Sequence, residues 1–167
     1  LTACAKKLGA VNTLVRRADG KLIGHNTDYF GFQSMVARSG LRVSGKKALV
    51  LGSGGASATA VAVLQELGAE VTVISRTGRN SYDNIALHSD ARIIVNATPV
   101  GMYPACENCP DIPYAMLSGS HYLFDLVYNP LTTRFMELGA EQGAATLSGI
   151  DMLYAQAESA WKIWCRD

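Results

Sequence analysis

Three glycines near position 53 could hold a phosphate group. Gly52, Gly54 and Gly55 follow an apolar run at 48–51 and precede an alanine-rich segment typical of a helix. A strand, a tight turn and a helix N-terminus direct backbone N–H groups and the positive end of the helix dipole toward an anion. The turn reads GSGGAS, so Gly52 and Gly54 match the first two positions of the dinucleotide fingerprint G-x-G-x-x-G, and the small Ser57 stands at the third. The spacing predicts a dinucleotide pyrophosphate here; the alternative is a purely structural turn.

The residues after the second expected strand, 70–75, indicate which dinucleotide fits. NAD-binding domains usually carry Asp or Glu there to hold the ribose 2′-OH. This chain has Ser75, Arg76 and Thr77 instead, with Arg79 close behind. An arginine can bind a 2′-phosphate through two parallel hydrogen bonds and stack on adenine. The pattern therefore favours NADP over NAD, against the alternative of an ordinary exposed arginine after a strand.

Asp28 is the candidate for proton transfer. It ends the sequence Asn26-Thr27-Asp28, directly before a helix expected over 29–38. Hydride transfer from an alcohol needs a group that takes the hydroxyl proton. The same residues also make an ordinary helix start, for which Thr27 or Asp28 is well suited as the cap.

The elements that must position these residues alternate between strands and helices. A helical segment is expected at 1–8 and a two-stranded hairpin at 10–25 around Asp19-Gly20. Further strands are expected at 48–51, 70–75, 91–95, 122–127 and 144–147, and further helices at 55–67, 132–142 and 149–164. Residues 77–90 leave room for one short helical turn. The β-branched run at 71–74 is typical of a strand buried on both faces. These patterns predict an α/β fold with a Rossmann-like, doubly wound, mostly parallel sheet and helices on both faces.

Composition excludes several other classes of protein. The 167 residues are 49% hydrophobic and 17% charged, which is typical of a globular chain. A net charge of +1 without a basic run argues against nucleic acid or an anionic membrane surface as partner. Four scattered cysteines do not make a disulfide scaffold, so a cytoplasmic location is expected.

Cys106 and Cys109 form a C-x-x-C pair with two alternative interpretations. Such a pair can be redox-active or bind a metal. No second pair accompanies it, and His25, His88 and His121 are dispersed. We therefore expect no metal, and an exposed loop with two incidental thiols.

Several motifs occur together in the order found in the shikimate dehydrogenase family. They are GAVNT at 9–13, NTD at 26–28, GSGGAS at 52–57, SRT at 75–77, NATPVGM at 96–102 and FDLVYNP at 124–130. The chain resembles this family over almost its whole length. Members reduce 3-dehydroshikimate to shikimate with NADPH, in the chorismate route to aromatic amino acids, and some relatives use NAD or accept quinate.

The resemblance implies a role for individual residues and segments. Residues 1–27 would be a remnant of the substrate-binding domain, 28–147 the NADP-binding domain, and 148–167 a helix returning toward the substrate domain. Asp28 would be catalytic together with a lysine, while the substrate would contact Asn12, Tyr128 and Gln156. Cofactor contacts would come from Gly52, Ser53, Gly54, Gly55, Ala56 and Ser57 at the pyrophosphate, from Ser75, Arg76, Thr77 and Arg79 at the 2′-phosphate, and from Thr98, Leu126 and Gly149 at the nicotinamide end.

The family's catalytic lysine lies upstream of the GAVNT motif, in a stretch that this chain lacks. Lys6 and Lys7 do not stand in its context, and the family's N-terminal serines that hold the substrate carboxylate are also absent. We therefore expect a C-terminal cofactor-binding portion, truncated at its N-terminus and at its C-terminus, that binds NADPH weakly to moderately and shows little or no turnover alone. The expected partner is a small-molecule substrate, shikimate or 3-dehydroshikimate. Two alternatives stay open: a quinate/shikimate dehydrogenase that uses NAD, and a non-catalytic nucleotide-binding module in which Asn12 and Asp28 are structural. The oligomeric state is not readable from the sequence.

Overall fold

The structure is a computed structural model and describes residues 1–165. In chain order its helices and strands are α1 (Ala3–Leu8), β1 (Thr13–Arg16), β2 (Leu22–His25), α2 (Asp28–Arg38), β3 (Lys47–Leu51), α3 (Gly55–Glu66), β4 (Glu70–Ile74), β5 (Ile93–Asn96), β6 (Tyr122–Asp125), α4 (Arg134–Glu141), β7 (Ala145–Ser148) and α5 (Ile150–Trp164). Two short 3-10 helices, η1 (Tyr82–His88) and η2 (Tyr114–Met116), lie in the connections. The predicted order and types of the elements are confirmed, with boundaries that differ by a few residues.

The main sheet is parallel, with five strands in the order β4-β3-β5-β6-β7. The chain runs outward from β3 through α3 to β4 and then crosses back to β5 on the other side of β3. Leu51 at the end of β3 is therefore paired with Ile74 of β4 and with Asn96 of β5. Open α/β sheets bind ligands at such a reversal, outside the carboxyl ends of the strands.

Apolar side chains fill both faces of this sheet. Val50 and Val95 point to one face, where Phe32 of α2 and Val63 of α3 pack against them. Leu49 and Leu51 point to the other face, against residues of η1, η2 and α4. Alternate residues of one apolar strand thus enter two separate cores, as a doubly wound sheet requires.

Two local expectations are wrong. Val71, Thr72 and Val73 of β4 are only half-buried, because the strand order places β4 at the edge of the sheet rather than inside it. Thr27 holds the N-cap position of α2, but its side chain makes no capping bond. The carboxamide of Asn26 accepts from the Tyr29 N–H at 3.2 Å instead, so the residue before the cap satisfies the helix end.

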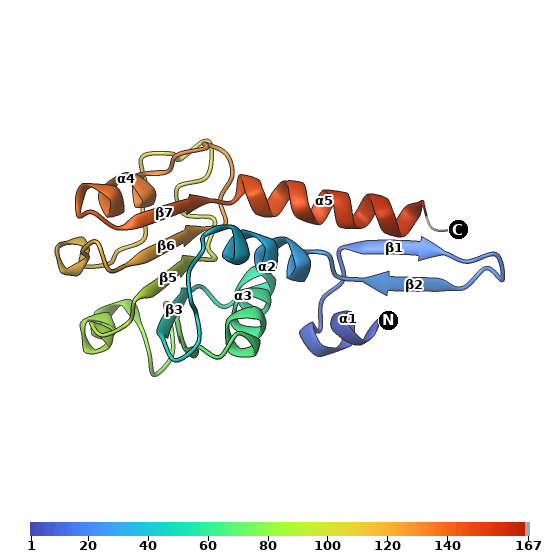
Figure 1. Ribbon diagram of the computed structural model, residues 1–167, viewed down its shortest axis with the longest axis horizontal. Helices are drawn as coiled ribbons and strands as arrows, with labels where there is room; N and C mark the ends of the chain where they lie inside the picture. The colour runs from blue at the N-terminus through green and yellow to red at the C-terminus, as the bar shows by residue number, and fades with distance from the viewer. Residues whose placement is uncertain (166–167) are drawn as a thin grey trace.

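The N-terminal segment forms an extension beside the sheet (Figure 1). β1 and β2 pair antiparallel, as predicted, and α1 lies next to them. α5 packs along α2 and reaches the hairpin, where the Trp164 indole N–H donates to the Leu14 carbonyl at 3.2 Å. Trp161 and Trp164 remain 66% and 54% exposed.

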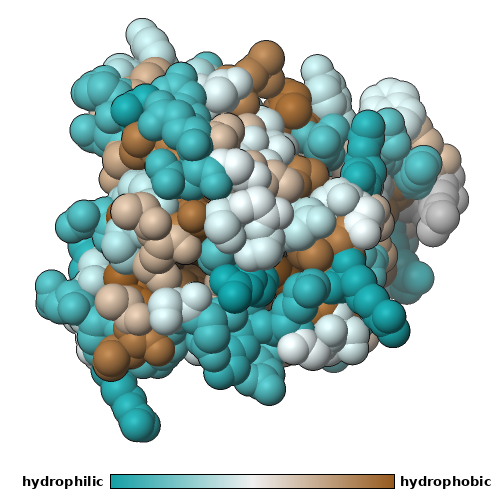
Figure 2. All heavy atoms as spheres, turned by 60° about the vertical axis from the view of Figure 1, so that its left-hand side comes forward, coloured by the Kyte–Doolittle hydropathy of each residue, from teal (hydrophilic) through white to brown (hydrophobic). Residues whose placement is uncertain are grey.

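The surface is mixed in character. On the face drawn in Figure 2, hydrophilic and hydrophobic residues are intermingled. Across residues 1–165, no helix combines the length and the apolarity that crossing a membrane requires.

Candidate functional site

A cleft of about 610 Å³ lies at the carboxyl edge of the sheet, where the strand order reverses. Its walls come from the segments that follow β3, β4 and β5. The lining residues from these segments are Gly52, Ser53, Gly54, Ser75, Arg76, Ala97, Thr98, Pro99 and Val100. Tyr82 of η1 and the loop residues Cys109, Pro110 and Asp111 complete it. The parallel topology therefore gathers the glycine turn and the arginine after β4 around one cleft.

Gly52 allows the turn after β3 to pass close to the loop after β5. Its N–H donates to the Ile74 carbonyl at 2.8 Å, and its φ is +108°. A Cβ at this position would lie 3.0 Å from the Ala97 carbonyl oxygen and 3.0 Å from Cγ2 of Thr98. Both the backbone conformation and the lack of space require glycine here.

The turn presents the start of α3 to the cleft. Gly54 is the N-cap and has no side chain to satisfy the helix end, and the first helical bond runs from the Ala58 N–H to the Gly54 carbonyl at 3.0 Å. The N–H groups of Gly55, Ala56 and Ser57 precede that bond and have no acceptor within the helix. They can therefore serve an anion, which the helix dipole also favours.

Residues of opposite charge line the cleft near Tyr82. Arg76 and Asp111 both line it, and Tyr82 lies within the influence of both. Burial raises the pKa of Tyr82, the positive charge of Arg76 opposes that shift, and Asp111 adds to it. The hydroxyl of Ser75 donates to the Thr77 carbonyl within its own loop.

A buried amide fixes the wall formed by the loop after β5. The Asn96 side chain is fully buried, and its Oδ1 accepts from the Thr98 N–H at 3.1 Å and from the Thr98 hydroxyl at 2.6 Å. Its Nδ2 donates to the Val100 carbonyl at 3.2 Å and to Oδ1 of Asp125 at 3.0 Å. The two cleft residues Thr98 and Val100 are thereby tied to the end of β6.

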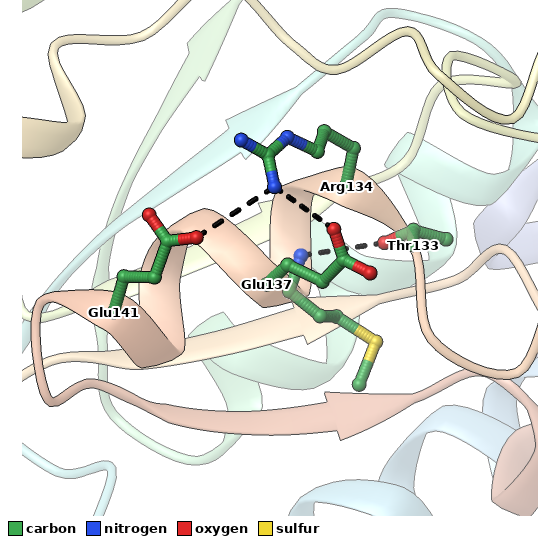
Figure 3. Close-up of polar contacts among 5 residues, drawn as sticks. Thr133, Arg134, Glu137 and Glu141 are labelled. Carbon is green, nitrogen blue, oxygen red and sulfur yellow. Dashed lines mark hydrogen bonds and ion pairs between the residues drawn. The ribbon is translucent and has the colours of Figure 1, made fainter.

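Asp125 anchors this wall from behind. It is fully buried, and besides Asn96 it accepts from the Val127 N–H at 3.0 Å and from the Thr133 hydroxyl at 2.5 Å. The Thr133 oxygen also accepts from the Met136 N–H at 3.4 Å and so caps α4, next to the exposed pairing of Arg134 with two glutamates (Figure 3). Burial raises the pKa of Asp125 to about 6 against the pull of these donors.

A second cluster surrounds the start of α2. Oδ1 of Asn12, which follows α1, accepts from the Thr27 N–H at 2.9 Å and from the Thr27 hydroxyl at 3.2 Å. The Thr27 hydroxyl also lies 3.2 Å from Oε1 of Gln156 on α5. α5 comes this close because Gly31 of α2 has no side chain; a Cβ there would meet the Met152 carbonyl oxygen at 2.8 Å.

Asp28 stands at the first position of α2, next to this cluster. Burial raises the pKa of its carboxyl above the ordinary value, and a hydrogen bond with the Asn12 side chain opposes the shift. Because Asn12 directs its oxygen at Thr27, its amino group is the part that can serve a carboxylate. The arrangement fixes Asp28 in orientation and makes it a better proton acceptor than a solvated aspartate.

The chain is 34% identical over 184 aligned positions to the shikimate dehydrogenase (NADP(+)) of Symbiobacterium thermophilum, covering 96% of the chain and 62% of that relative. The crystal structure of shikimate 5-dehydrogenase from Thermus thermophilus in complex with NADP(H) and shikimate matches with a TM-score of 0.86 at 33% identity, over 98% of the chain and 65% of that structure. Over nearly its whole length the chain is therefore similar to shikimate dehydrogenases. It spans less than two thirds of the length of these relatives.

Relatives with another cofactor have the same fold. The quinate dehydrogenase from Corynebacterium glutamicum in complex with NAD matches with a TM-score of 0.83 at 26% identity, over 96% of the chain and 64% of that structure. No family model matches the chain. The similarity to shikimate dehydrogenase structures confirms the Rossmann-like fold.

The structure brings about half of the residues predicted for the cofactor to the cleft. Those that line it are Gly52, Ser53, Gly54, Ser75, Arg76 and Thr98. Those outside its lining are Gly55, Ala56, Ser57, Thr77, Arg79, Leu126 and Gly149. Ser57 is buried, which suits the close helix packing expected of its position. Leu126 and Gly149 lie so close together that a Cβ added at Gly149 would collide with the Leu126 carbonyl.

Of the residues predicted for shikimate dehydrogenase chemistry, Asn12, Asp28 and Gln156 come together around Thr27. Tyr128 is 46% exposed, and within residues 1–165 no hydrogen bond joins its side chain to that cluster. Thr27, which links two of the predicted residues, was missed because it was considered only as a possible helix cap.

The cleft residues Tyr82, Cys109 and Asp111 were also missed, since they come from irregular segments without a motif of their own. The expectation of an exposed loop is wrong for the cysteines. Cys106 and Cys109 are half-buried, and Cys109 lines the cleft. The buried Asp125 carried one usable signal, because an acid at the end of an apolar strand needs partners.

Proposed function

We propose that the chain is the cofactor-binding portion of an NADP-dependent shikimate dehydrogenase, an oxidoreductase that interconverts 3-dehydroshikimate and shikimate. The observation that supports this most directly is that the glycine turn after β3 and Arg76 after β4 line the same cleft. No acid stands at the end of β4 to hold a ribose 2′-OH. In this proposal residues 1–27 belong to the substrate-binding domain and residues 28–147 form the NADP-binding domain. Residues 148–167 form a helix that returns toward the substrate-binding domain, and 166–167 lie outside the described residues.

The residues present fit a phosphorylated dinucleotide. The free N–H groups at the start of α3 would hold the pyrophosphate, with Gly52–Ser57 as the cradle. Arg76, with Ser75, Thr77 and Arg79 in the same loop, would hold the 2′-phosphate. Thr98, Leu126 and Gly149 would border the nicotinamide end. NADP, when bound, supplies or accepts the hydride.

Asp28 would exchange the proton of the reacting hydroxyl. Its partly buried carboxylate has a raised pKa, which brings it closer to the value that efficient proton transfer needs. Asn12 would orient that carboxylate and hydrogen-bond a substrate hydroxyl, and Gln156 and Tyr128 would contact the substrate from α5 and from the segment after β6. In the family, a lysine upstream of GAVNT shares the proton transfer. A cytoplasmic location, where NADPH-dependent biosynthesis operates, is part of the same proposal.

Replacing Arg76 tests the cofactor assignment. We expect Arg76→Ala to weaken NADPH binding by roughly 10- to 100-fold, because hydrogen bonds to a charged group contribute about 1.5–3 kcal/mol. NADH binding should change little, since NADH has no 2′-phosphate. Fluorescence titration of both nucleotides gives the two dissociation constants. Arg17→Ala in the exposed hairpin is the matched control for loss of one positive charge.

The cofactor assignment fails if the unmodified chain binds neither nucleotide or binds NADH more tightly than NADPH. Tighter NADH binding would favour the alternative of a quinate/shikimate dehydrogenase that uses NAD. Equal losses for both nucleotides in Arg76→Ala would place Arg76 at the shared part of the two molecules rather than at the 2′-phosphate.

A further inference from the structure

The β4–η1 loop, residues 75–81, is closed on itself. The Ser75 N–H donates to the Asn80 carbonyl at 3.2 Å, and Ser75 and Ser81 form an isolated parallel bridge. Gly78, at the middle of the loop, has a φ of +137°, a conformation that side chains disfavour. The two ends of the loop are therefore joined by backbone contacts where the chain passes from the edge strand β4 to the 3-10 helix η1.

One side chain outside this loop fastens its far end. Nδ2 of Asn84, in η1, donates to the Arg79 carbonyl at 2.8 Å. Oδ1 of the same amide accepts from the Ser81 N–H at 2.9 Å. Asn84 thus uses both ends of its amide on the backbone of the loop, and replacement by an apolar side chain such as leucine removes both bonds together.

The loop carries two exposed arginines, Arg76 and Arg79. Within residues 1–165, neither forms an ion pair that would hold its side chain in place. The bonds of the loop backbone are therefore what limits where the guanidinium groups can reach. A guanidinium group binds a phosphate through two parallel hydrogen bonds only in a defined orientation. A more mobile loop backbone therefore reduces the fraction of molecules that can bind the 2′-phosphate.

We propose that Asn84 is a positioning residue that sets the preference for a 2′-phosphorylated nucleotide by holding the β4–η1 loop closed. This inference rests on the proposed NADP site. Asn84 lies in η1, bonds the backbone of the loop and acts through Arg76 and Arg79. Its effect is confined to the end of the nucleotide that carries the 2′-phosphate, since the glycine turn after β3 is held by separate contacts.

Two small nucleotides test this directly. Isothermal titration of 2′,5′-ADP reports the 2′-phosphate contact, and 5′-AMP serves as the probe that lacks it. Asn84→Leu should raise the dissociation constant for 2′,5′-ADP about tenfold, because a smaller fraction of the molecules has the loop closed. The dissociation constant for 5′-AMP should change less than about twofold. Leu87→Ala, at an 80% exposed position of the same 3-10 helix, is the control and should alter neither constant.

A second variant reaches the loop without touching Asn84. Gly78→Ala should produce the same selective loss, because the alanine side chain strains the φ of +137° and comes within 3.3 Å of the Ser75 hydroxyl. Selective loss in both variants supports the positioning role. Unchanged 2′,5′-ADP binding in a folded Asn84→Leu, or equal losses for both nucleotides, overturns it. If the unmodified chain does not prefer 2′,5′-ADP over 5′-AMP, the proposed NADP site itself is wrong. This result differs from the results that overturn only the positioning role of Asn84.

Discussion

Asp28→Asn is expected to lower kcat for shikimate oxidation by about 10²- to 10⁴-fold, the usual contribution of a positioned acid–base group. The experiment uses the chain joined to the N-terminal segment of a relative, which restores the family's lysine. Asparagine keeps the shape of the side chain and its place beside Asn12 but cannot take a proton. NADPH binding should be unchanged, because Asp28 lies at the start of α2 and not in the cleft. Steady-state rates of NADP reduction measure the effect.

Asp151→Asn is the matched control, since Asp151 is also an acid in the first turn of a helix and pairs with Arg38 at the surface. Full activity of the joined protein with Asp28→Asn would show that Asp28 is a structural cap. A joined protein that is inactive even with Asp28 intact, although it binds NADPH, would favour the non-catalytic module.

The pH profile of the joined protein follows from the same residue. Burial raises the pKa of Asp28, so the carboxyl stays protonated to a higher pH than an ordinary aspartate. Shikimate oxidation needs the ionised form, and the acidic limb of kcat/KM should therefore lie above the usual range for aspartate. Asp151→Asn should leave that limb in place.

The second large effect is expected at Asp125, on the stability of the fold. Its pKa is raised from 3.8 to about 6 in the folded state, so the folded protein binds this proton more tightly than the unfolded chain does. The resulting contribution of Asp125 to the free energy of unfolding is fully present below pH 4 and is lost as the pH rises through about 6. A shift of this size corresponds to about 3 kcal/mol between the ends of that window.

Asp125→Asn should remove this pH dependence without breaking the network. An asparagine oxygen can accept from Asn96 and Val127 as Oδ1 of Asp125 does, and its amino group can donate to the Thr133 oxygen. Chemical denaturation at several pH values between 4 and 8 measures the difference between the variant and the unmodified chain. Other carboxylates contribute equally to both proteins, so they cancel in this comparison.

Asp125→Ala should behave differently and destabilise the fold by roughly 3–5 kcal/mol at neutral pH, because three buried donors lose their acceptor. The same loss should loosen Thr98 and Val100 in the cleft wall. If the two variants are equally destabilised, or if Asp125→Asn retains the full slope with pH, the buried carboxylate does not titrate as expected.

Local patterns in the sequence determined most of the fold and the chemistry of the candidate site. The glycine turn, the arginine after β4 and the hairpin at Asp19-Gly20 were all predictable, because each depends on a few neighbouring residues with fixed backbone or side-chain chemistry. The alternation of strands and helices followed from periodicity, which reports the immediate surroundings of each segment.

Only the tertiary structure decided what those segments surround. The strand order made β4 an edge strand, whereas its β-branched run resembles that of an interior strand. Thr27 and Gln156 meet across 129 positions because α5 packs on α2 at Gly31. Tyr82 and Asp111 enter the cleft, and Asp125 becomes a buried anchor, through the crossing of whole elements. Such contacts depend on the sum of many weak packing terms over the entire chain, and no short stretch of sequence carries that sum.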